Sequence, residues 1–230
     1  MKYIGIVVAM DEERQEILDL MTETEVKQIY NLRFITGKIQ KRNCVLIKSG
    51  IGKVNAARTT QILVDNFDLD FVINAGAAGA INYLLNIGDV VIAKHVVQHD
   101  FDITAFGHPK GFISNIGQHV ESDSKLLEKM RTTINKINNK DFKIKVGVIA
   151  SGDIFCTETK MKEKIRSKFL ADAIEMESAA IAQVCKLDNM PFIIIRSISD
   201  NPNGNNLITY KEYLEMATKR CAQIIKAYLY

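Results

Sequence analysis

Two carboxylates occupy a segment of the chain that otherwise has the composition of protein interior. Residues 173–182 are AIEMESAAIA, so Glu175 and Glu177 lie among Ala, Ile and Met. An ionised carboxylate in the interior is costly unless a cation or hydrogen-bond donors pair with it. In an extended segment the two side chains face the same way, whereas in a helix they lie about 200° apart. Either they flank a bend and reach water or they serve a charged site, and we do not expect both to belong to the core.

Further acids follow predicted strands elsewhere in the chain. Glu12 and Glu13 come directly after a buried N-terminal strand, and Asp200 ends the apolar run PFIIIRSISD. Acids in the first turn of a helix often do no more than complement the helix dipole, which is our interpretation of Asp11 and Glu12. The remaining acids are candidates for proton transfer or for stabilising positive charge.

The motif SGIGKVNAA at 49–57 is two-thirds of a dinucleotide fingerprint. Gly50 and Gly52 lie in a strand-to-helix turn, but Asn55 stands at the third glycine position. The spacing of a phosphate-binding Walker loop is also lacking. We therefore interpret this segment as a turn whose glycines let the backbone approach a ligand closely.

The string HVVQHD at 95–100 has histidines that could bind a metal ion if it were helical. Its apolar surroundings favour a strand, where His95 and His99 would be about 13 Å apart, so we expect no metal site. No Ser-His-Asp order or activated cysteine can be assigned either. Cys156 follows SGDIF, and a lone, partly buried thiol is usually inert, so we expect it only to line a pocket.

Apolar runs alternate with segments of helical period along the chain, which predicts an α/β fold. Several strands are apolar on both faces, as expected for a mixed sheet covered by helices on both sides, and we expect a single domain over residues 1–230. We predict strands at 3–9, 43–48, 70–75, 89–98, 144–150 and 191–198. We predict helices at 11–21, 53–66, 122–138, 158–169, 177–188 and 209–228.

Small and acidic residues gather where the predicted strands end, in AMDEE, SGIGK, NAGAAG, SGD and SISD. If the strands are largely parallel, these residues meet at the carboxyl edge, where α/β sheets bind their ligands. The Gly-rich stretch 107–119 is a long loop, and such loops are usually functional. NPNGNN at 201–206 is a candidate for a flexible segment that closes over a ligand.

Composition excludes several classes of protein. The chain has 230 residues, 47% of them hydrophobic, and its net charge of +3 comes from interspersed charges without a basic block, which argues against nucleic acid as a partner. Its apolar runs are far shorter than the roughly 20 residues of a membrane span. Four cysteines lie far apart without a CxxC pair, which is typical of reduced thiols. We expect a cytoplasmic protein that binds no membrane.

Seven fragments of the chain, taken together, resemble one family. AMDEE, SGIGKVNAA, NAGAAG followed by GD, HDFDITAFG, SGDIF, IEMESAAIA and RSISD occur in the order and approximate spacing of the 5'-methylthioadenosine/S-adenosylhomocysteine nucleosidases. The resemblance spans essentially the entire chain, and IEMES with RSISD is its most specific part.

This resemblance implies a three-layer nucleoside phosphorylase-like fold, with a central mixed twisted sheet flanked by helices, usually assembled as a homodimer. The implied reaction is hydrolysis of the N-ribosidic bond of 5'-methylthioadenosine and S-adenosylhomocysteine, and of 5'-deoxyadenosine as well. The products are adenine and a 5-thioribose derivative. No metal and no organic cofactor is implied.

The resemblance also assigns the chemistry. Cleavage of a ribosidic bond makes the sugar cationic and the leaving base anionic, so it calls for an acid at the base, a base that activates water and anionic groups at the sugar. Asp200 is then the acid that protonates adenine N7, kept protonated by an apolar, desolvated surround and oriented by Ser199. Glu13, and not Glu12, is the base for water. Glu177 binds the ribose hydroxyls and stays ionised.

Other residues are implied to hold the substrate. Glu175 is a second contact on the ribose side, although it could equally reach solvent or pair elsewhere, and Arg196 positions Glu13 and the water. The backbone around Phe155 and Cys156 contacts adenine, on which the Phe155 ring stacks. The residues implied to line the sugar and 5'-alkylthio pocket are Met10, Ile51, Gly79, Met176, Tyr210 and, from the neighbouring subunit, Phe106.

One position departs from the family pattern. The turn at 76–79 is Gly76, Ala77, Ala78 and Gly79, whereas the family commonly has Ser or Thr at the position of Ala77. Ala77 therefore lacks a hydroxyl that would lie near the water or a ribose oxygen. A backbone amide or an additional water could replace it.

Several rivals stay open. A purine nucleoside phosphorylase shares the fold, but phosphate would be repelled by the acidic rim AMDEE. A futalosine-type hydrolase would differ in the 5' substituent of its substrate more than in its catalytic acids. A catalytically silent nucleoside-binding protein should have lost an acid, yet Glu13, Glu177 and Asp200 are all present. A dinucleotide-dependent oxidoreductase is the weakest alternative.

Overall fold

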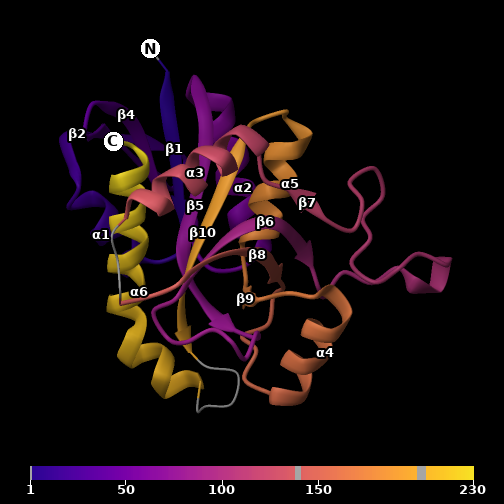
Figure 1. The fold of residues 1–230 in the computed structure, drawn as a ribbon. Coiled ribbons are helices and arrows are strands. Elements are labelled where there is room, and N and C mark those ends of the chain that lie inside the picture. Colours follow the sequence, from indigo (N-terminus) through magenta and orange to yellow (C-terminus); the bar gives the residue numbers. More distant parts are fainter. Residues whose placement is uncertain (1, 138–140, 201–205) are drawn as a thin grey trace.

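A mixed sheet runs through the centre of the molecule (Figure 1), and the computed structural model describes residues 2–137, 141–200 and 206–230. Most of the segment 201–206 therefore lies outside the described residues, and its closure over a ligand stays a prediction. The strands of the sheet are β1 (Tyr3–Val8), β2 (Met21–Ile29), β3 (Leu32–Ile39), β4 (Arg42–Lys48), β5 (Leu69–Ala80), β6 (Val90–Gln98), β7 (Val120–Glu121), β8 (Ile144–Ser151), β9 (Ala173–Glu175) and β10 (Phe192–Asp200).

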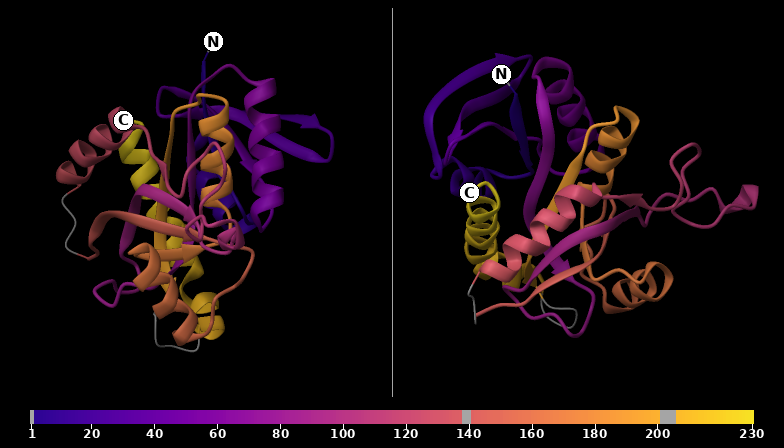
Figure 2. Two further views of the ribbon diagram at one scale, coloured as in Figure 1. Left: turned by 90° about the vertical axis from the view of Figure 1, so that its right-hand side faces the viewer. Right: turned by 45° about the horizontal axis from the view of Figure 1, so that its top comes forward.

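Helices cover both faces of this sheet, which gives the three layers that were expected. They are α1 (Asp11–Leu18), α2 (Lys53–Asn66), α3 (Ser124–Lys136), α4 (Thr159–Phe169), α5 (Ser178–Leu187) and α6 (Asn206–Tyr228), with a 3-10 turn η1 (Thr104–Phe106). Apolar residues of α2 and α5 pack on one face of the sheet, and those of α1, α3 and α6 pack on the other. The two sides are visible in the left view of Figure 2. The α/β prediction is therefore confirmed.

The strands that carry the candidate acids are partly parallel and partly antiparallel. β1, β4, β5 and β10 run parallel to one another, as expected. β6 and β9 run antiparallel to β10 and β5, and β8 pairs parallel with both of them. The strands β5, β10, β6, β8 and β9 thus pair in a closed circuit, which brings the end of β8 to the same region as the ends of β5 and β10.

The hairpin of β2 and β3 is the main element that the sequence patterns did not predict. The first helix was expected to reach Met21, but α1 ends at Leu18 and Met21 begins β2. Along β2 almost every side chain is exposed, so the strand lacks the alternation of apolar and polar residues that predicts a half-buried strand. Antiparallel pairing with β3, whose inner residues are buried, holds it in place.

The chain between β6 and β7 extends away from the rest of the molecule, as the right view of Figure 2 shows. This segment contains η1 and the Gly-rich stretch 107–119, which is a loop as expected. A single bridge pairs Ile113 with Gly117, and the rings of His108 and Phe112 stack with centroids 4.5 Å apart. None of the described helices is long and apolar enough to cross a bilayer.

Candidate active site

A cavity of about 410 Å³ opens where β5, β9 and β10 meet the first turn of α1. All of the predicted site residues except Phe106 line it. The lining residues are Ala9, Met10, Glu13, Ile51, Ala77, Ala78, Gly79, Ile154, Phe155, Cys156, Ile174, Glu175, Met176, Glu177, Arg196, Ser199, Asp200 and Tyr210. Its size suits a small organic ligand.

Glu13 is buried at the start of α1, with 3% of its surface exposed. Its Oε2 accepts hydrogen bonds from the amides of Ala9 (2.7 Å) and Met10 (3.1 Å), and its Oε1 accepts one from the amide of Ala77 (3.0 Å). Burial raises the pKa of Glu13, against the opposing effects of Arg196 and these amides. A carboxylate with a raised pKa is a better proton acceptor near neutral pH. The neighbouring Glu12 is exposed.

The contact between Glu13 and β5 depends on Gly76. A Cβ built on Gly76 would overlap both Oε1 of Glu13 and a guanidinium nitrogen of Arg196. The absence of a side chain at this position therefore lets the carboxylate and the guanidinium lie against the strand. The amide of Ala77 donates to Glu13, and the replacement of the missing hydroxyl by a backbone amide or a water stays a prediction.

Asp200 lies at the end of β10, 4% exposed, beside Gly79 of β5. The register shifts between Ile198 and Asp200, so Ser199 is the extra residue of a β-bulge, a feature that re-aims side chains near active sites. Oδ1 of Asp200 accepts a hydrogen bond from Oγ of Ser199 at 3.1 Å, as predicted. Oδ2 lies 3.0 Å from Nζ of Lys162, which is 1% exposed. The expected desolvation is present, but the surround is not simply apolar because a buried cation is part of it.

Arg196 connects the carboxylates of the site from the middle of β10, with 1% of its surface exposed. Its guanidinium lies 2.6 Å from Oε2 of Glu175 and 3.6 Å from Oε2 of Glu177. It also donates to Asn74 and to Oγ of Ser178. Arg196 was expected to position Glu13. Its nearest ion-pair partners among the described residues are Glu175 and Glu177, and it acts on Glu13 through its charge.

Glu175 and Glu177 are both buried, at 7% and 4% exposure, so the expectation that they could not both belong to the core was wrong. Arg196 lies between them and offsets the cost of burying two charges. Oε2 of Glu175 accepts hydrogen bonds from the amides of Glu177 and Ser178, and Oε1 accepts one from the hydroxyl of Ser151. Glu175 thus lines the cavity with a carboxylate that protein donors already bind.

Glu177 differs because fewer donors reach it. It precedes α5, and its Oε1 accepts one hydrogen bond, from the amide of Gly52 at 3.0 Å. Burial and the charge of Glu175 raise the pKa of Glu177 to about 8. The expectation that Glu177 stays ionised therefore remains a prediction, and the raised pKa of this carboxyl acts against it. Two carboxylates share one guanidinium, and because fewer donors reach Glu177, its charged form is the less stabilised of the two.

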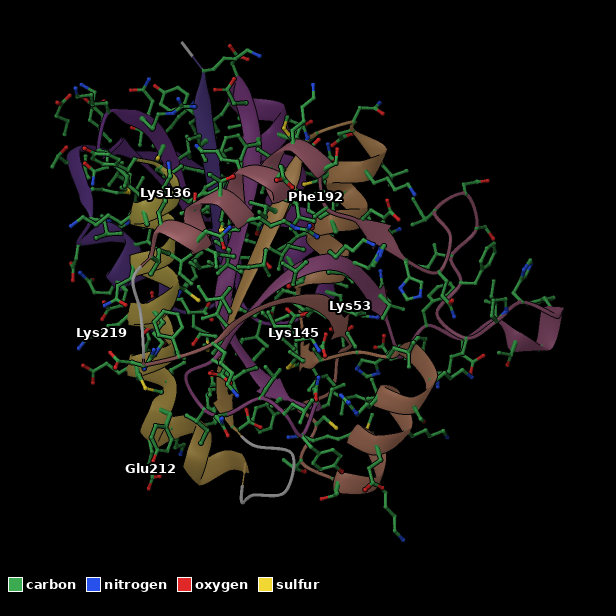
Figure 3. The ribbon with its side chains drawn as sticks, viewed as in Figure 1. Lys53, Lys136, Lys145, Phe192, Glu212 and Lys219 are labelled. Atoms are coloured by element: carbon green, nitrogen blue, oxygen red, sulfur yellow. The ribbon has the colours of Figure 1, made fainter. Side chains whose placement is uncertain are left out.

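The turn before α2 holds the amide that contacts Glu177. Gly52 has a positive φ of 96°, a backbone conformation that favours glycine. Lys53, labelled in Figure 3, donates its amide to Asp153 and lies with its ammonium 2.7 Å from Asp100. These contacts tie the turn to the SGD segment after β8, so Gly50 and Gly52 belong to a turn that approaches the cavity, as expected.

Aromatic side chains also line the cavity. Phe155 is 44% exposed, and its ring meets that of Tyr210 edge-on, with centroids 5.6 Å apart. The hydroxyl of Tyr210 lies 2.9 Å from Sδ of Met10. Cys156 is buried beside them, and burial raises the pKa of its thiol, which therefore stays neutral as a lining group.

Phe106 lies apart from the cavity in the protruding segment, in η1. Its side chain is 81% exposed. The proposed reach of Phe106 into a neighbouring subunit stays a prediction, because a single chain is described.

Sequence reasoning missed residues that hold the acids in place: Gly76, Asn74, Ser151, Ser178 and Lys162. Lys162 had a usable signal, since it lies three and seven residues before the buried Ile165 and Phe169 on one face of α4. A lysine on an apolar stripe needs a partner. The others carried no such signal, because their roles depend on contacts between distant strands.

Comparisons with known proteins agree with this arrangement. A family model described as the phosphorylase superfamily matches residues 3–230. The 5'-methylthioadenosine/S-adenosylhomocysteine nucleosidase of Staphylococcus haemolyticus (strain JCSC1435) is 39% identical over 225 residues, 97% of each chain. A solved structure of the Helicobacter pylori nucleosidase of the same name, in complex with a substituted pyrrolidin-3-ol, has a TM-score of 0.93 at 34% identity, and the match covers 99% of this chain and 97% of that chain. A structure described as Helicobacter pylori futalosine hydrolase matches equally, with a TM-score of 0.93, 34% identity and the same coverage.

Proposed function

Because the chain belongs to the phosphorylase superfamily and, within it, to the 5'-methylthioadenosine/S-adenosylhomocysteine nucleosidases, we propose that it hydrolyses the N-ribosidic bond of these two nucleosides. The products are adenine and the 5-thioribose derivative. The enzyme is then an N-glycosyl hydrolase whose partner is a small nucleoside.

One observation carries this proposal: two buried carboxyls, one on α1 and one on β10, line the same cavity and lie against β5 at two different places. Glu13 lies against Gly76 and Asp200 lies against Gly79. These glycines are three residues apart, which is about 10 Å along a strand. Carboxyls held at two such places can leave room for a water and a sugar ring between an acid and a base, which is the arrangement of glycosidases that act by direct attack of water.

The roles follow from the surroundings of each group. Asp200 donates a proton to N7 of adenine, which turns the departing base into a neutral molecule. Glu13 accepts a proton from the attacking water, supported by the raised pKa that burial gives it. Glu177 meets the ribose hydroxyls and, in its ionised form, stabilises positive charge on the sugar. Glu175 keeps Arg196 and the start of α5 in place rather than contacting the substrate through its carboxylate.

Water suits this site better than phosphate as the nucleophile. Four carboxyls line the cavity, whereas Arg196 is the cation among its described lining residues, and its guanidinium is bound by Glu175. A phosphate dianion beside Glu13 would be repelled. This argument separates the proposal from a purine nucleoside phosphorylase on the same fold.

The 5' substituent is the open part of the specificity. The similarity to a protein described as futalosine hydrolase makes futalosine-type hydrolysis the second candidate. The residues proposed at the 5' end are Met10, Ile51 and Tyr210, and Ile51 is 52% exposed at the rim, so the cavity is open in this direction. 5'-Deoxyadenosine, which lacks the sulfur substituent, is a further substrate in the proposal.

A homodimer and a cytoplasmic location also belong to the proposal. The exposed Phe106 supports the dimer, since a large aromatic side chain at the tip of a protruding segment is costly to leave in water. The four cysteines are unpaired and buried, as is common in reducing compartments.

The decisive experiment is adenine release in buffer without phosphate. We expect the protein to release adenine from 5'-methylthioadenosine and S-adenosylhomocysteine there, with no stimulation by added phosphate. Release that depends on phosphate would establish a phosphorylase instead. Parallel assays with futalosine and 5'-deoxyadenosine measure the preference at the 5' position.

A further inference from the structure

Lys162 is a buried, charged residue beside the cavity, and the proposed mechanism assigns it no role. It lies on α4 with 1% of its surface exposed, and its Nζ is 3.0 Å from Oδ2 of Asp200. The three other lysines of this helix, Lys160, Lys164 and Lys168, are exposed. A fully buried lysine is rare and requires a partner of opposite charge, which Asp200 supplies.

We propose that Lys162 is a positioning residue for the catalytic acid, whose ammonium orients Asp200 and compensates the charge left on it after proton transfer. The proposal deepens the function proposed above and rests on it. An ammonium can only donate hydrogen bonds, so it keeps Oδ2 as an acceptor. Oδ1, which also accepts from Ser199, is then the oxygen that carries the proton towards adenine.

The reaction makes this charge necessary. As the C1'–N9 bond breaks, its electron pair moves to adenine, the O–H bond of Asp200 breaks and an N7–H bond forms. The water oxygen bonds to C1', and the water proton passes to Glu13. Asp200 is left as a carboxylate at 4% exposure, where an unpaired charge is costly. The ammonium at 3.0 Å stabilises this carboxylate as it develops.

Other groups around Asp200 cannot supply this compensation. Ser199 is neutral, and the Cys156 thiol has a pKa raised by burial and by the charge of Asp200 among other causes. Gly79 and Ala78 of β5 lie beside Asp200 and Ser199 but carry no charged side chain. Among the described residues, the positive charge that contacts Asp200 comes from Lys162.

The test compares Lys162→Met, Lys162→Gln and Lys162→Arg with the control Lys164→Met, which removes an exposed charge from the same helix. With 5'-methylthioadenosine we expect Lys162→Met and Lys162→Gln to lower kcat about 100-fold with KM changed less than about threefold, as for other buried groups that stabilise developing charge. Lys162→Arg should keep most of the activity, and Lys164→Met all of it. Gln retains hydrogen-bond donors without the charge, so it separates the charge from packing if the Met variant is unstable.

Two further readouts distinguish this role from a merely structural ion pair. The basic limb of the kcat profile should move to higher pH in Lys162→Gln, because the acid loses its proton less readily without the cation. In an Asp200→Asn background, Lys162→Gln should cost no further activity, since the two residues act as a unit. If the Lys162 variants lowered only the melting temperature and left kcat and the basic limb of its pH profile unchanged, the proposed role of Lys162 would be wrong. The proposed nucleosidase function would still stand if the wild-type protein released adenine. A wild-type protein that released no adenine would overturn both.

Discussion

Glu13 of α1 lies against the backbone of Gly76 in β5, in the space that a side chain at position 76 would fill. The contact joins two segments 63 residues apart in the chain, 76 minus 13. It places the proposed base beside the guanidinium of Arg196, which would also be overlapped by a Cβ on Gly76. The geometry of the base thus depends on a residue that itself carries no chemistry.

Gly76→Ala should therefore damage catalysis more than stability. The added methyl group displaces the Glu13 carboxylate, so we expect kcat to fall about 100-fold, in the range of losing a general base. Overpacking should lower the free energy of unfolding by about 1–3 kcal/mol. Gly5→Ala in β1 is the matched control, because its Cβ meets apolar side chains, nearest Leu63, away from the cavity. If Gly5→Ala lost as much activity as Gly76→Ala, general destabilisation would be the explanation.

Adjacent glutamates offer a second matched pair. Glu13→Gln removes the proposed base and should lower kcat about 10²- to 10⁴-fold, while the amide oxygen can still accept the hydrogen bonds from the amides of Ala9 and Met10. Glu12→Gln removes the same charge one residue earlier, where the side chain is exposed, and should keep wild-type kcat. Steady-state assays of adenine release measure both. Equal activities of the two variants would reject the assignment of the base.

The raised pKa of Glu177 predicts how stability changes with pH. The folded protein keeps a proton on this carboxyl up to about pH 8, whereas the ordinary value for Glu is 4.5. Between these values the folded state binds more protons than the unfolded chain, so the free energy of unfolding falls as pH rises. Glu13, whose pKa is also raised, contributes in the same direction.

Glu177→Gln should remove part of this dependence. We expect a shallower decline of the free energy of unfolding between about pH 5 and pH 8 than in the wild type, measured by urea unfolding at several pH values. Glu12→Gln, an exposed control, should keep the wild-type slope. A slope unchanged in Glu177→Gln would mean that this carboxyl is ionised in the folded protein.

Phe106 predicts a site shared between two subunits. Light scattering should detect a dimer, and Phe106→Ala should raise KM about tenfold by removing roughly 1.4 kcal/mol of apolar contact with the substrate. Leu84→Ala is the control, since Leu84 is similarly exposed at 76% against 81% for Phe106.

A mixing experiment makes this prediction sharper. In a heterodimer of Phe106→Ala with Glu13→Gln, one of the two sites receives both wild-type residues. Co-expressed variants should therefore be more active than the average of the two separate proteins. Simple averaging, or a fully active monomer, would contradict the reach of Phe106 across an interface.

The sequence predicted those elements whose patterns are local. The periodic segment 53–66 is α2 with the same bounds, and the apolar run 191–198 is most of β10. It predicted β5 only as far as residue 75, because Gly and Ala in NAGAAGA are poor strand formers. Pairing with β10 along Gly76 to Gly79 overrides this preference.

The candidate site was predictable in its members more than in its electrostatics. The cavity gathers Glu13, Glu177 and Asp200 from three separate segments, as the strand ends indicated. The sharing of Arg196 by two buried carboxyls was not visible, since it depends on the distance between β10 and the start of α5. The raised pKa of Glu177 follows from its burial and from the neighbouring Glu175, so it could not be read from a one-dimensional pattern.

The short stretch of β5 between Gly76 and Gly79 has a consequence for how this protein can diverge. Backbone spacing there sets the separation of the proposed acid and base, whereas the residues proposed at the 5' end, Ile51 and Tyr210, come from a turn and from α6. Natural selection can therefore alter Ile51 or Tyr210 and change which nucleosides are accepted while bond cleavage is left intact. A one-residue insertion in the strand would do the reverse, abolishing turnover on every substrate at once.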